Sequence, residues 1–398
     1  MQASSRSPTR RFALALAIAT MSGASAADIS SIDVGSTPRW LAGDDRGVSA
    51  LLADGRVVSI RGKEVVARGE GLSPDAPLHD CAGELLGVAT DGALVSIDTN
   101  NRVSRSAAAL LSPRGGLACA FAAAWGIAAD GRLLRFERRG RQWVAVKQAS
   151  AEALPDARIV LSDLAGNGAA KLFVLAEGSA TRYRHGVLGD TVEPTALLMI
   201  DPDSLAIEAR LALPAPMVFE DLLPRPLSIA ARPALALVRA SPSGGAALVL
   251  IGIERTNLGI VASGPDFGQS SRWLNPLVGA SSLYAVLTPH IGGMLYRYQR
   301  RGDKLAPMPL ATGVSTHRIG SRQLEGAAVI ERRGGRVLIL LPSQAQSRLI
   351  ALDCNGRCKT LASYPLAGAT SSNLLVARDF AWIGDEAGLV SRIALPRN

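Results

Sequence analysis

The chain has 398 residues, a formal net charge of +9 and an aromatic content of 4%. A nucleic-acid surface would need clustered basic residues, with aromatic residues between them for single strands, whereas the arginines here are scattered along the chain. We therefore expect no nucleic-acid partner. The positive charge leaves two roles open, solubility or weak attraction to an anionic envelope surface.

The N-terminus has the features of an export signal. Arg10 and Arg11 precede an apolar run, and the small residues up to Ala26 suit a signal peptidase. The apolar run is much shorter than the roughly 20 residues that cross a bilayer. We predict a signal peptide over residues 1–26 and a periplasmic or secreted chain over residues 27–398 without a transmembrane segment. The paired arginines suit the twin-arginine route and the general export route equally well.

Three segments near the N-terminus repeat one pattern, which is a short apolar strand, an Asp-Gly turn and a second strand. The segments are residues 47–60, 86–97 and 125–136, with turns at Asp54, Asp91 and Asp130. The turns are 37 and 39 residues apart. Near the C-terminus, residues 381–393 repeat the phrase that begins at Ala124.

A period near 40 residues, built of short strands and tight turns, is typical of a β-propeller. At roughly 40–50 residues per blade, residues 27–398 predict an all-β fold, a single closed β-propeller of seven or eight blades without bare sheet edges. The phrase shared by the first and last repeats fits a ring whose ends meet. An open β-solenoid and a two-domain sandwich are the alternatives. The low aromatic content argues against WD40-type blades.

Cys354 and Cys358 lie in a predicted hairpin. Residues 349–352 and 359–364 have strand character, and the Asn-Gly step between the cysteines is a strong hairpin signal. A three-residue loop would set the cysteines opposite each other, with Cα atoms about 4.5–5.5 Å apart and within reach of a disulfide. Zinc would need two further ligands, and a redox motif would have two residues between the cysteines. In an exported chain we predict a local disulfide.

The other two cysteines, Cys81 and Cys119, precede their Asp-Gly turns by 10 and 11 residues. They therefore occupy near-equivalent places in adjacent blades. Facing sheets pack about 10 Å apart, which is too far for a disulfide, but blades converge near the axis. A Cys81–Cys119 disulfide and two buried thiols are the alternatives.

The middle of the chain contains a different motif. Residues 159–174 combine a strand, a loop with Asp163 and Asn167, and a second strand. The segment resembles an FG-GAP/VCBS repeat of the integrin-α type of propeller, whose calcium loop is Asp-x-Asp-Gly-Asp-Gly. Here Ala165 and Lys171 stand where that family has acids, and calcium needs six or more oxygen ligands. We predict a retained turn without bound metal.

The resemblance extends over about residues 154–330. It rests on phrases that we associate with exported FG-GAP proteins of Gram-negative bacteria, namely residues 183–190, 218–225, 272–276, 289–291 and 316–320. Where such proteins have another Asp-rich loop, between Pro276 and Pro289, this chain has Gly-Ala-Ser-Ser-Leu-Tyr. The resemblance implies an exported propeller with eroded calcium loops, and it implies no particular activity.

The same phrases contain the polar residues best suited to a site. Loops from several blades converge at the rim of a propeller channel, so distant phrases can share one site. The candidate ligand-binding residues are His185, Glu220, Arg225, Arg272, Trp273, His290, His317 and Arg318, accompanied by Asp190, Glu193 and Asp221. Together they could bind an anion or a sugar, or transfer protons. The structural alternative is a set of hydrogen bonds and ion pairs that holds irregular blades together.

Motifs of known enzyme classes are missing from the sequence. It contains no Gly-x-Ser-x-Gly, His-Glu-x-x-His, Walker loop or Cys-x-x-Cys, nor the Trp-rich blade phrases of quinone-dependent dehydrogenases. We predict no catalytic residues and no cofactor. The expected protein is a monomeric, non-catalytic scaffold for a protein or glycan partner in the periplasm or outside the cell. The alternative is a hydrolase or lyase that uses the histidine-rich rim.

Overall fold

The computed structural model describes residues 29–44, 47–120, 122–354 and 356–396. Almost all regular structure in these ranges is β-strand, and the helical elements there are two short 3₁₀ turns, η2 (Gly186–Leu188) and η3 (Arg333–Gly335). No helix in the described part of the chain is long and apolar enough to cross a membrane. The predicted signal peptide, residues 1–26, lies outside the described residues. The predicted all-β class is confirmed.

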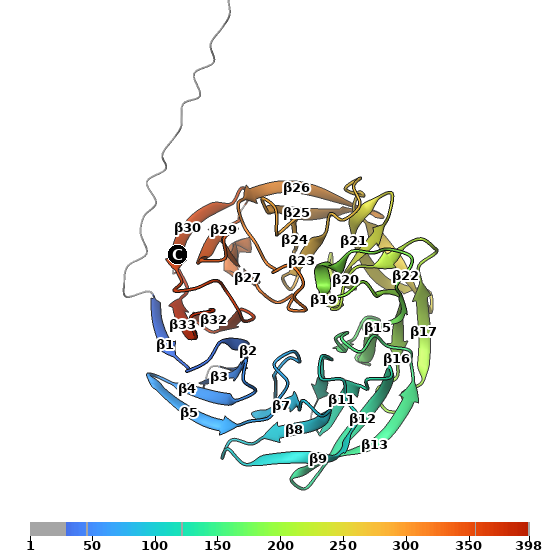
Figure 1. The fold of residues 1–398 in the computed structure, drawn as a ribbon. Coiled ribbons are helices and arrows are strands. Elements are labelled where there is room, and N and C mark those ends of the chain that lie inside the picture. Colours follow the sequence, from blue (N-terminus) through green and yellow to red (C-terminus); the bar gives the residue numbers. More distant parts are fainter. Residues whose placement is uncertain (1–28, 45–46, 121, 355, 397–398) are drawn as a thin grey trace, which may run out of the picture.

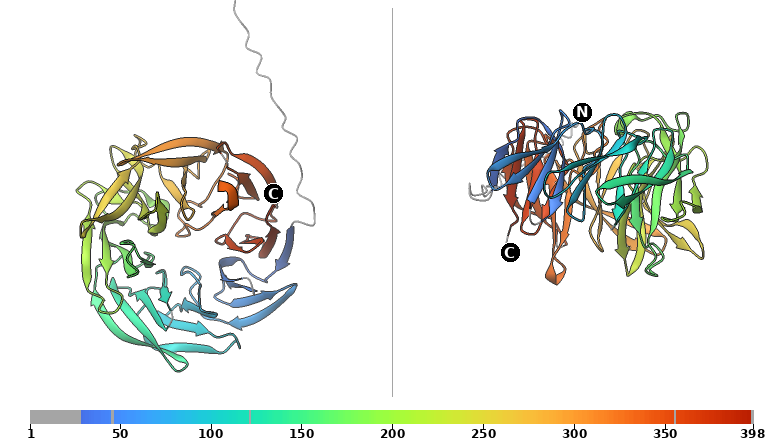
Figure 2. Two further views of the ribbon diagram at one scale, coloured as in Figure 1. Left: turned by 180° about the vertical axis from the view of Figure 1, so that it is seen from behind. Right: turned by 90° about the horizontal axis from the view of Figure 1, so that it is seen from below.

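The sheets stand like blades around a common axis (Figures 1 and 2). Six sheets of the described chain have four strands each, and one has nine. The first three consist of β2 (Pro38–Asp44), β3 (Gly47–Leu52), β4 (Val57–Arg61) and β5 (Glu64–Gly69); β6 (His79–Cys81), β7 (Glu84–Val88), β8 (Ala93–Ile97) and β9 (Val103–Ala109); and β10 (Ala118–Ala120), β11 (Ala123–Ile127), β12 (Arg132–Arg139) and β13 (Gln142–Ser150).

The predicted Asp-Gly turns lie in these three successive sheets, between the second and third strand of each. Gly55, Gly92 and Gly131 have φ values of +82°, +87° and +82°, which favour glycine. In the first turn the Asp54 carboxylate accepts the backbone N–H of Arg56 at 3.1 Å. The carbonyl of each turn glycine also accepts an N–H from the connection to the next sheet, at 2.9–3.2 Å. The turn chemistry thus holds neighbouring sheets together.

The remaining four sheets follow in chain order. The fourth consists of β14 (Val160–Ser162), β15 (Lys171–Ser179), β16 (Glu193–Ile200) and β17 (Ile207–Ala212). The nine-stranded sheet consists of β18 (Val218–Phe219), β19 (Arg225–Ile229), β20 (Arg232–Ser241), β21 (Gly245–Glu254), β22 (Asn257–Ser263), β23 (Leu274–Val278), β24 (Leu283–Leu287), β25 (Met294–Arg301) and β26 (Lys304–Thr312). The next consists of β27 (Ala328–Glu331), β28 (Val337–Pro342), β29 (Arg348–Asp353) and β30 (Lys359–Pro365), and the last of β31 (Leu375–Ala377), β32 (Phe380–Gly384), β33 (Leu389–Ala394) and β1 (Ile29–Asp33).

The first strand pairs with the last. β1 is antiparallel to β33 from Ile29↔Ile393 to Asp33↔Leu389, so both ends of the described chain share one sheet. This agrees with the expectation that the first and last repeats meet. The nine-stranded sheet has a weak junction, because only the pair Ser263↔Lys304 joins β22 to β26.

The core lies between neighbouring sheets. One cluster combines Trp125 of β11, Phe173 of β15, Phe219 of β18 and Val249 of β21, and the last three are fully buried. Their packing removes apolar surface from water across three sheets at once. The core therefore resists separation of adjacent sheets as well as unfolding of any one of them.

Both pairs of cysteines form disulfides. Cys81 ends β6 and Cys119 lies in β10, with Cα atoms 6.1 Å apart, and these are the first strands of adjacent sheets. Cys354 and Cys358 close the β29–β30 hairpin with Cα atoms 4.0 Å apart. Asn355 of the predicted three-residue loop lies outside the described residues.

Candidate functional site

The antiparallel order of the strands places most of the candidate residues on one face of the ring. This face, called the turn face here, carries the turns between second and third strands and the connections between sheets. His185 lies in the β15–β16 loop, His290 in the β24–β25 turn and His317 in the β26–β27 connection. Trp273 directly precedes β23, and Glu220 follows β18. We call these five residues the histidine cluster.

His185 and Glu220 form a short hydrogen bond. His185 Nδ1 lies 2.5 Å from Glu220 Oε1, and the Glu220 side chain is fully buried. Burial, and then the charge of Asp221, raise the pKa of Glu220 well above its usual range. Burial, and then the charge of Arg272, lower the pKa of His185. The second oxygen, Glu220 Oε2, is buried without a hydrogen-bond partner among the described residues.

Trp273 joins this pair to the other two histidines. Its Nε1–H donates to the Glu220 carbonyl at 2.9 Å, and its ring stacks on His290 with centroids 6.1 Å apart and planes 9° apart. His290 Nε2 lies 2.8 Å from His317 Nδ1, and His317 Nε2 lies 2.8 Å from the carbonyl oxygen of Ser321. Burial lowers the pKa of His290 to about 4 and that of His317 to about 3.

Arg225 belongs to a buried network beneath the histidine cluster. Its guanidinium donates to Asp221 at 2.8 Å and to Asn275 at 3.0 Å, and Arg225 and Asp221 are both almost inaccessible. Asn275 in turn donates to Thr316 at 3.2 Å. A buried charge is tolerated only when it is paired and hydrogen-bonded, and these contacts provide that for Arg225 and Asp221.

Arg272 and Arg318 lie outside the hydrogen-bonded cluster. Arg272 is exposed and donates to the Ser271 carbonyl at 3.3 Å, while its charge still reaches His185. Arg318 pairs with Glu386. Five of the eight candidate residues are thus brought together by hydrogen bonds and ring contacts. Arg225 belongs to the separate buried network, Arg272 lies near His185, and Arg318 lines a different pocket.

The β26–β27 connection extends from the outer strands towards the middle of the ring (Figure 1). Its residues 313–327 bond to four distant segments: Gly320 N–H to Val187 O at 2.9 Å, Arg158 to Arg322 O at 3.1 Å, Gln323 to Arg39 O at 2.8 Å, and Leu374 N–H to Glu325 O at 2.9 Å. The connection is therefore a clamped plug, and it lines a polar pocket of about 290 Å³ together with Arg39 and Glu386.

Ion pairs that were not predicted from the sequence anchor this plug. Arg322 pairs with Asp156 at 2.7 Å and with Asp190 at 2.8 Å. Arg158 is buried, lies 3.8 Å from Glu325 and packs over the Trp40 ring at 5.4 Å. These residues are isolated charged residues in loops that are far apart in sequence, and they belong to no motif. Their contacts therefore could not be predicted from the spacing of residues in the sequence.

Glu193 is a second buried carboxyl group near the histidine cluster. Only 2% of the residue is exposed, and burial, followed by the charges of Glu220 and Asp190, raises the pKa of Glu193 to about 10. Burial thus holds Glu193 in the uncharged form at neutral pH, and it shifts the pKa of Glu220 in the same direction.

The loop that resembles a calcium site is closed by protein groups. Asp163 accepts the backbone N–H groups of Asn167 at 3.1 Å and Gly168 at 2.6 Å. Lys171 Nζ bonds Asp201 at 2.9 Å and Glu208 at 2.7 Å. Among the described residues no group of three or more His, Cys, Asp or Glu side chains could hold a metal ion.

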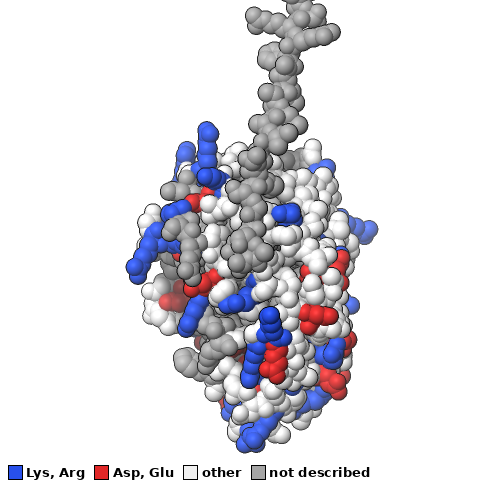
Figure 3. All heavy atoms as spheres, turned by 90° about the vertical axis from the view of Figure 1, so that its left-hand side faces the viewer, with Lys and Arg blue, Asp and Glu red and all other residues white. Residues whose placement is uncertain are grey.

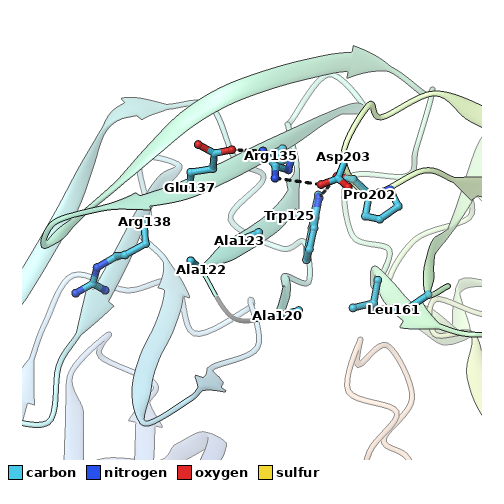
Figure 4. Close-up of a pocket in the computed structure, with 11 residues that line it drawn as sticks. Ala120, Ala122, Ala123, Trp125, Arg135, Glu137, Arg138, Leu161, Pro202 and Asp203 are labelled. Atoms are coloured by element: carbon cyan, nitrogen blue, oxygen red, sulfur yellow. Dashed lines mark hydrogen bonds and ion pairs between the residues drawn. The ribbon is translucent and has the colours of Figure 1, made fainter. Parts of the chain in front are cut away.

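A separate pocket of about 450 Å³ lies between the β10–β13 and β14–β17 sheets, away from the turn face. Figure 4 shows Arg135 between Glu137 and Asp203, with Trp125 beneath it. Trp125 Nε1–H donates to the Pro202 carbonyl at 2.8 Å. This pocket was not predicted from the sequence, because it forms only where two sheets meet and bring Asp203 to Arg135.

Charged side chains form no continuous patch on the side of the ring seen in Figure 3. Basic and acidic residues are interspersed there, with large uncharged areas between them. This agrees with the scattered arginines of the sequence.

The fold resembles solved β-propellers across nearly its whole length. BamB from Moraxella catarrhalis has a TM-score of 0.60 at 13% identity, covering 92% of this chain and 99% of that one. The Dos1 propeller has a TM-score of 0.61 at 10% identity, with 93% and 95% covered. Saccharomyces cerevisiae Sqt1 has a TM-score of 0.60 at 9% identity, with 92% and 98% covered.

Comparison of the sequence with models of known families gives no match, and comparison with curated proteins gives none either. Identities of 9–13% establish a fold and nothing finer. The chain has the β-propeller fold.

Proposed function

We propose that the chain is an exported, non-catalytic binding scaffold that holds a protein partner on its turn face. The ring in this proposal is closed and has eight blades, within the predicted range of seven or eight. The nine-stranded sheet counts as two blades because one parallel pair joins its halves, and β1 completes the last blade. Two disulfides support an exported chain, since such bonds persist in oxidising compartments.

A relation to FG-GAP propellers is part of this proposal. It is supported by the arrangement of β14 and β15, which are two strands joined by a loop that Asp163 organises, as in an FG-GAP repeat. The calcium ligands of such a loop are replaced by the Lys171 ion pairs.

The observation that carries the function is a pair of exposed isoleucines on clamped loops. Ile291 is 69% exposed and Ile319 is 71% exposed. They follow His290 and His317 closely in sequence, and those two histidines are bonded to each other at 2.8 Å. Exposed apolar side chains that are held rigidly lose little entropy on binding and suit a protein surface. A glycan partner would need polar groups at these positions instead.

The buried polar residues of the same face favour the same interpretation. Glu220, His317 and Arg225 are 0–5% exposed. Glu220 bonds His185, His317 bonds the Ser321 carbonyl oxygen, and Arg225 bonds Asp221. They stiffen the loops and contribute little surface of their own. The plug pocket beside them contains Arg39, Arg318 and Glu386, which would form the polar rim of an interface.

A photo-crosslinking amino acid placed at Ile291 and, separately, at Ile319 tests this proposal in cells that produce the protein. Matched controls carry it at Ile207 in β17 and Met308 in β26, which are exposed apolar positions on outer strands. We expect one discrete protein adduct from both turn-face positions and none from the controls. The absence of an adduct at both Ile291 and Ile319, or the same adduct at all four positions, would contradict the proposal.

A further inference from the structure

Two histidines on the turn face each keep one ring nitrogen without a hydrogen-bond partner in the described part of the chain. They are His185 Nε2 and His290 Nδ1, since the other nitrogen of each ring bonds Glu220 or His317. Neither is among the buried side-chain atoms that lack a partner. Both nitrogens therefore reach solvent, and the hydrogen-bond network behind each ring determines what it offers there.

The network behind His290 makes its free nitrogen an acceptor. His317 Nε2 lies 2.8 Å from the Ser321 carbonyl oxygen, which can only accept, so Nε2 carries the proton. In the neutral ring of His317, Nδ1 then accepts from His290 Nε2–H. His290 is neutral as well, because burial holds its pKa near 4. His290 Nδ1 is consequently a bare acceptor.

The network behind His185 makes its free nitrogen a donor. Glu220 is fully buried, and an ionised carboxylate there would need a positively charged partner. The pair is therefore neutral overall, with either a protonated Glu220 or a charged His185. A proton on Glu220 Oε2 would have no partner, whereas on Oε1 it is shared with Nδ1 across 2.5 Å. In either form His185 Nε2 carries a hydrogen.

The two rings share one neighbourhood. Trp273 donates to the backbone of Glu220, the partner of His185, and stacks parallel to His290. The charge of His185 also reaches His290 and lowers its pKa. A donor and an acceptor thus lie in the same part of the turn face, next to Ile291 on the chain.

We propose that His185 and His290 recognise a side-chain carboxamide, from an Asn or Gln of the partner. His185 Nε2–H donates to the carboxamide oxygen, and His290 Nδ1 accepts from its N–H. A carboxylate would meet the lone pair of His290, and an ammonium would meet the N–H of His185. A trans backbone amide has its N–H and C=O on opposite sides, so a single one cannot satisfy both histidines. This inference rests on the proposed binding function and names the chemistry of its contact.

The test uses the chain labelled with ¹⁵N-histidine at pH 7, since four histidines give only eight ring nitrogens. Without ligand, we expect the Nε2–H form for His185 and a bare Nδ1 for His290. Acetamide is then titrated as the probe, against N-methylacetamide, N,N-dimethylacetamide and acetate. We expect saturable shifts of His185 Nε2 and His290 Nδ1 with acetamide alone. The buried His79 is the internal reference.

Two variants test whether both histidines take part in binding. His290→Asn is expected to abolish the response of His185 to acetamide, while His79→Gln leaves it intact. Reversed tautomers, equal shifts with N-methylacetamide or acetate, or no shift with acetamide would each overturn the inference. Release of acetate and ammonia from acetamide would show that the site hydrolyses carboxamides, and would overturn the inference that it only binds them. Crosslinking at Ile291 and Ile319 does not depend on these histidines, so failure of the carboxamide site and failure of the scaffold function are distinguishable.

Discussion

At the scale of single residues, this protein stabilises uncharged forms of groups that are normally charged. Burial raises the pKa of Glu193 to about 10 and lowers that of His317 to about 3. The sequence predicted that His185, Glu220, Trp273 and His290 could share a site, because polar loop residues of a propeller converge. It could not predict which atoms donate and which accept, since that depends on contacts made only after folding.

The carboxyl group of Glu193 makes stability fall as the pH rises. Its pKa in the unfolded chain is near 4.5 and in the folded chain about 10, so between these values only the unfolded state releases the proton. The favourable contribution is complete below pH 4.5 and is lost towards pH 10. Glu193→Gln should therefore stabilise the fold at pH 8 by on the order of 2 kcal/mol, and should change little at pH 4.5.

Urea unfolding at both pH values measures this effect. Glu64→Gln is the matched control, because Glu64 is an exposed residue of β5. A stability gain for Glu193→Gln that is equal at both pH values would show that the carboxyl group is ionised in the folded state.

At the scale of single elements, the residues in the turns determine which hairpins form. The flanks predicted for the cysteine hairpin, residues 349–352 and 359–364, correspond to β29 and β30 within one residue at each end. The Asp163 loop keeps its turn because the carboxylate bonds backbone N–H groups that a calcium loop would also organise. Such local signals were visible in the sequence because each involves residues only a few positions apart.

The Cys354–Cys358 disulfide should stabilise its hairpin much more than the whole fold. It closes a very short loop, so it removes little entropy from the unfolded chain and should contribute less than the typical roughly 2–4 kcal/mol. We expect the double variant C354S/C358S to keep its fold while amide exchange accelerates in β29 and β30. Hydrogen-exchange mass spectrometry measures both. Global unfolding of the variant would contradict this.

Calcium should have no effect on stability. The Lys171 ammonium bonds Asp201 and Glu208 beside the Asp163 loop, and a second cation there would be repelled. Thermal unfolding with millimolar calcium and with a chelator should give the same midpoint within about a degree. Lys171→Met, which removes this cation, is the matched comparison. A decrease of several degrees in the wild-type chain with chelator would refute the prediction.

At the scale of the whole molecule, two sets of long-range contacts hold the ring together, namely the pairing of β1 with β33 and the contacts of the β26–β27 connection. β1 covers the outer edge of β33, and Ile32 packs into the core of the first sheet. The plug, residues 313–327 of the β26–β27 connection, forms hydrogen bonds with four segments that are distant in sequence. None of these contacts joins neighbours in sequence.

Removal of β1 should therefore lower stability strongly. A chain that begins at Thr37 loses the pairing with β33 and leaves an unpaired sheet edge exposed. Compared with a chain that begins at Ala27, we expect a melting temperature lower by several degrees and a greater tendency to aggregate. Calorimetry and light scattering measure these two effects. Equal melting temperatures would mean that the pairing of β1 with β33 does not stabilise the fold.

The sequence by itself determined the all-β class, the repeated Asp-Gly hairpins and the local disulfide, because these depend on turn residues and strand alternation within short stretches. Only the tertiary structure decided that Cys81 bonds Cys119, that Arg322 anchors the plug and that Glu220 is buried against His185. Those contacts join residues that are tens to more than a hundred positions apart. They form only when inner strands and loops converge on the axis, and a sequence period cannot encode that distance.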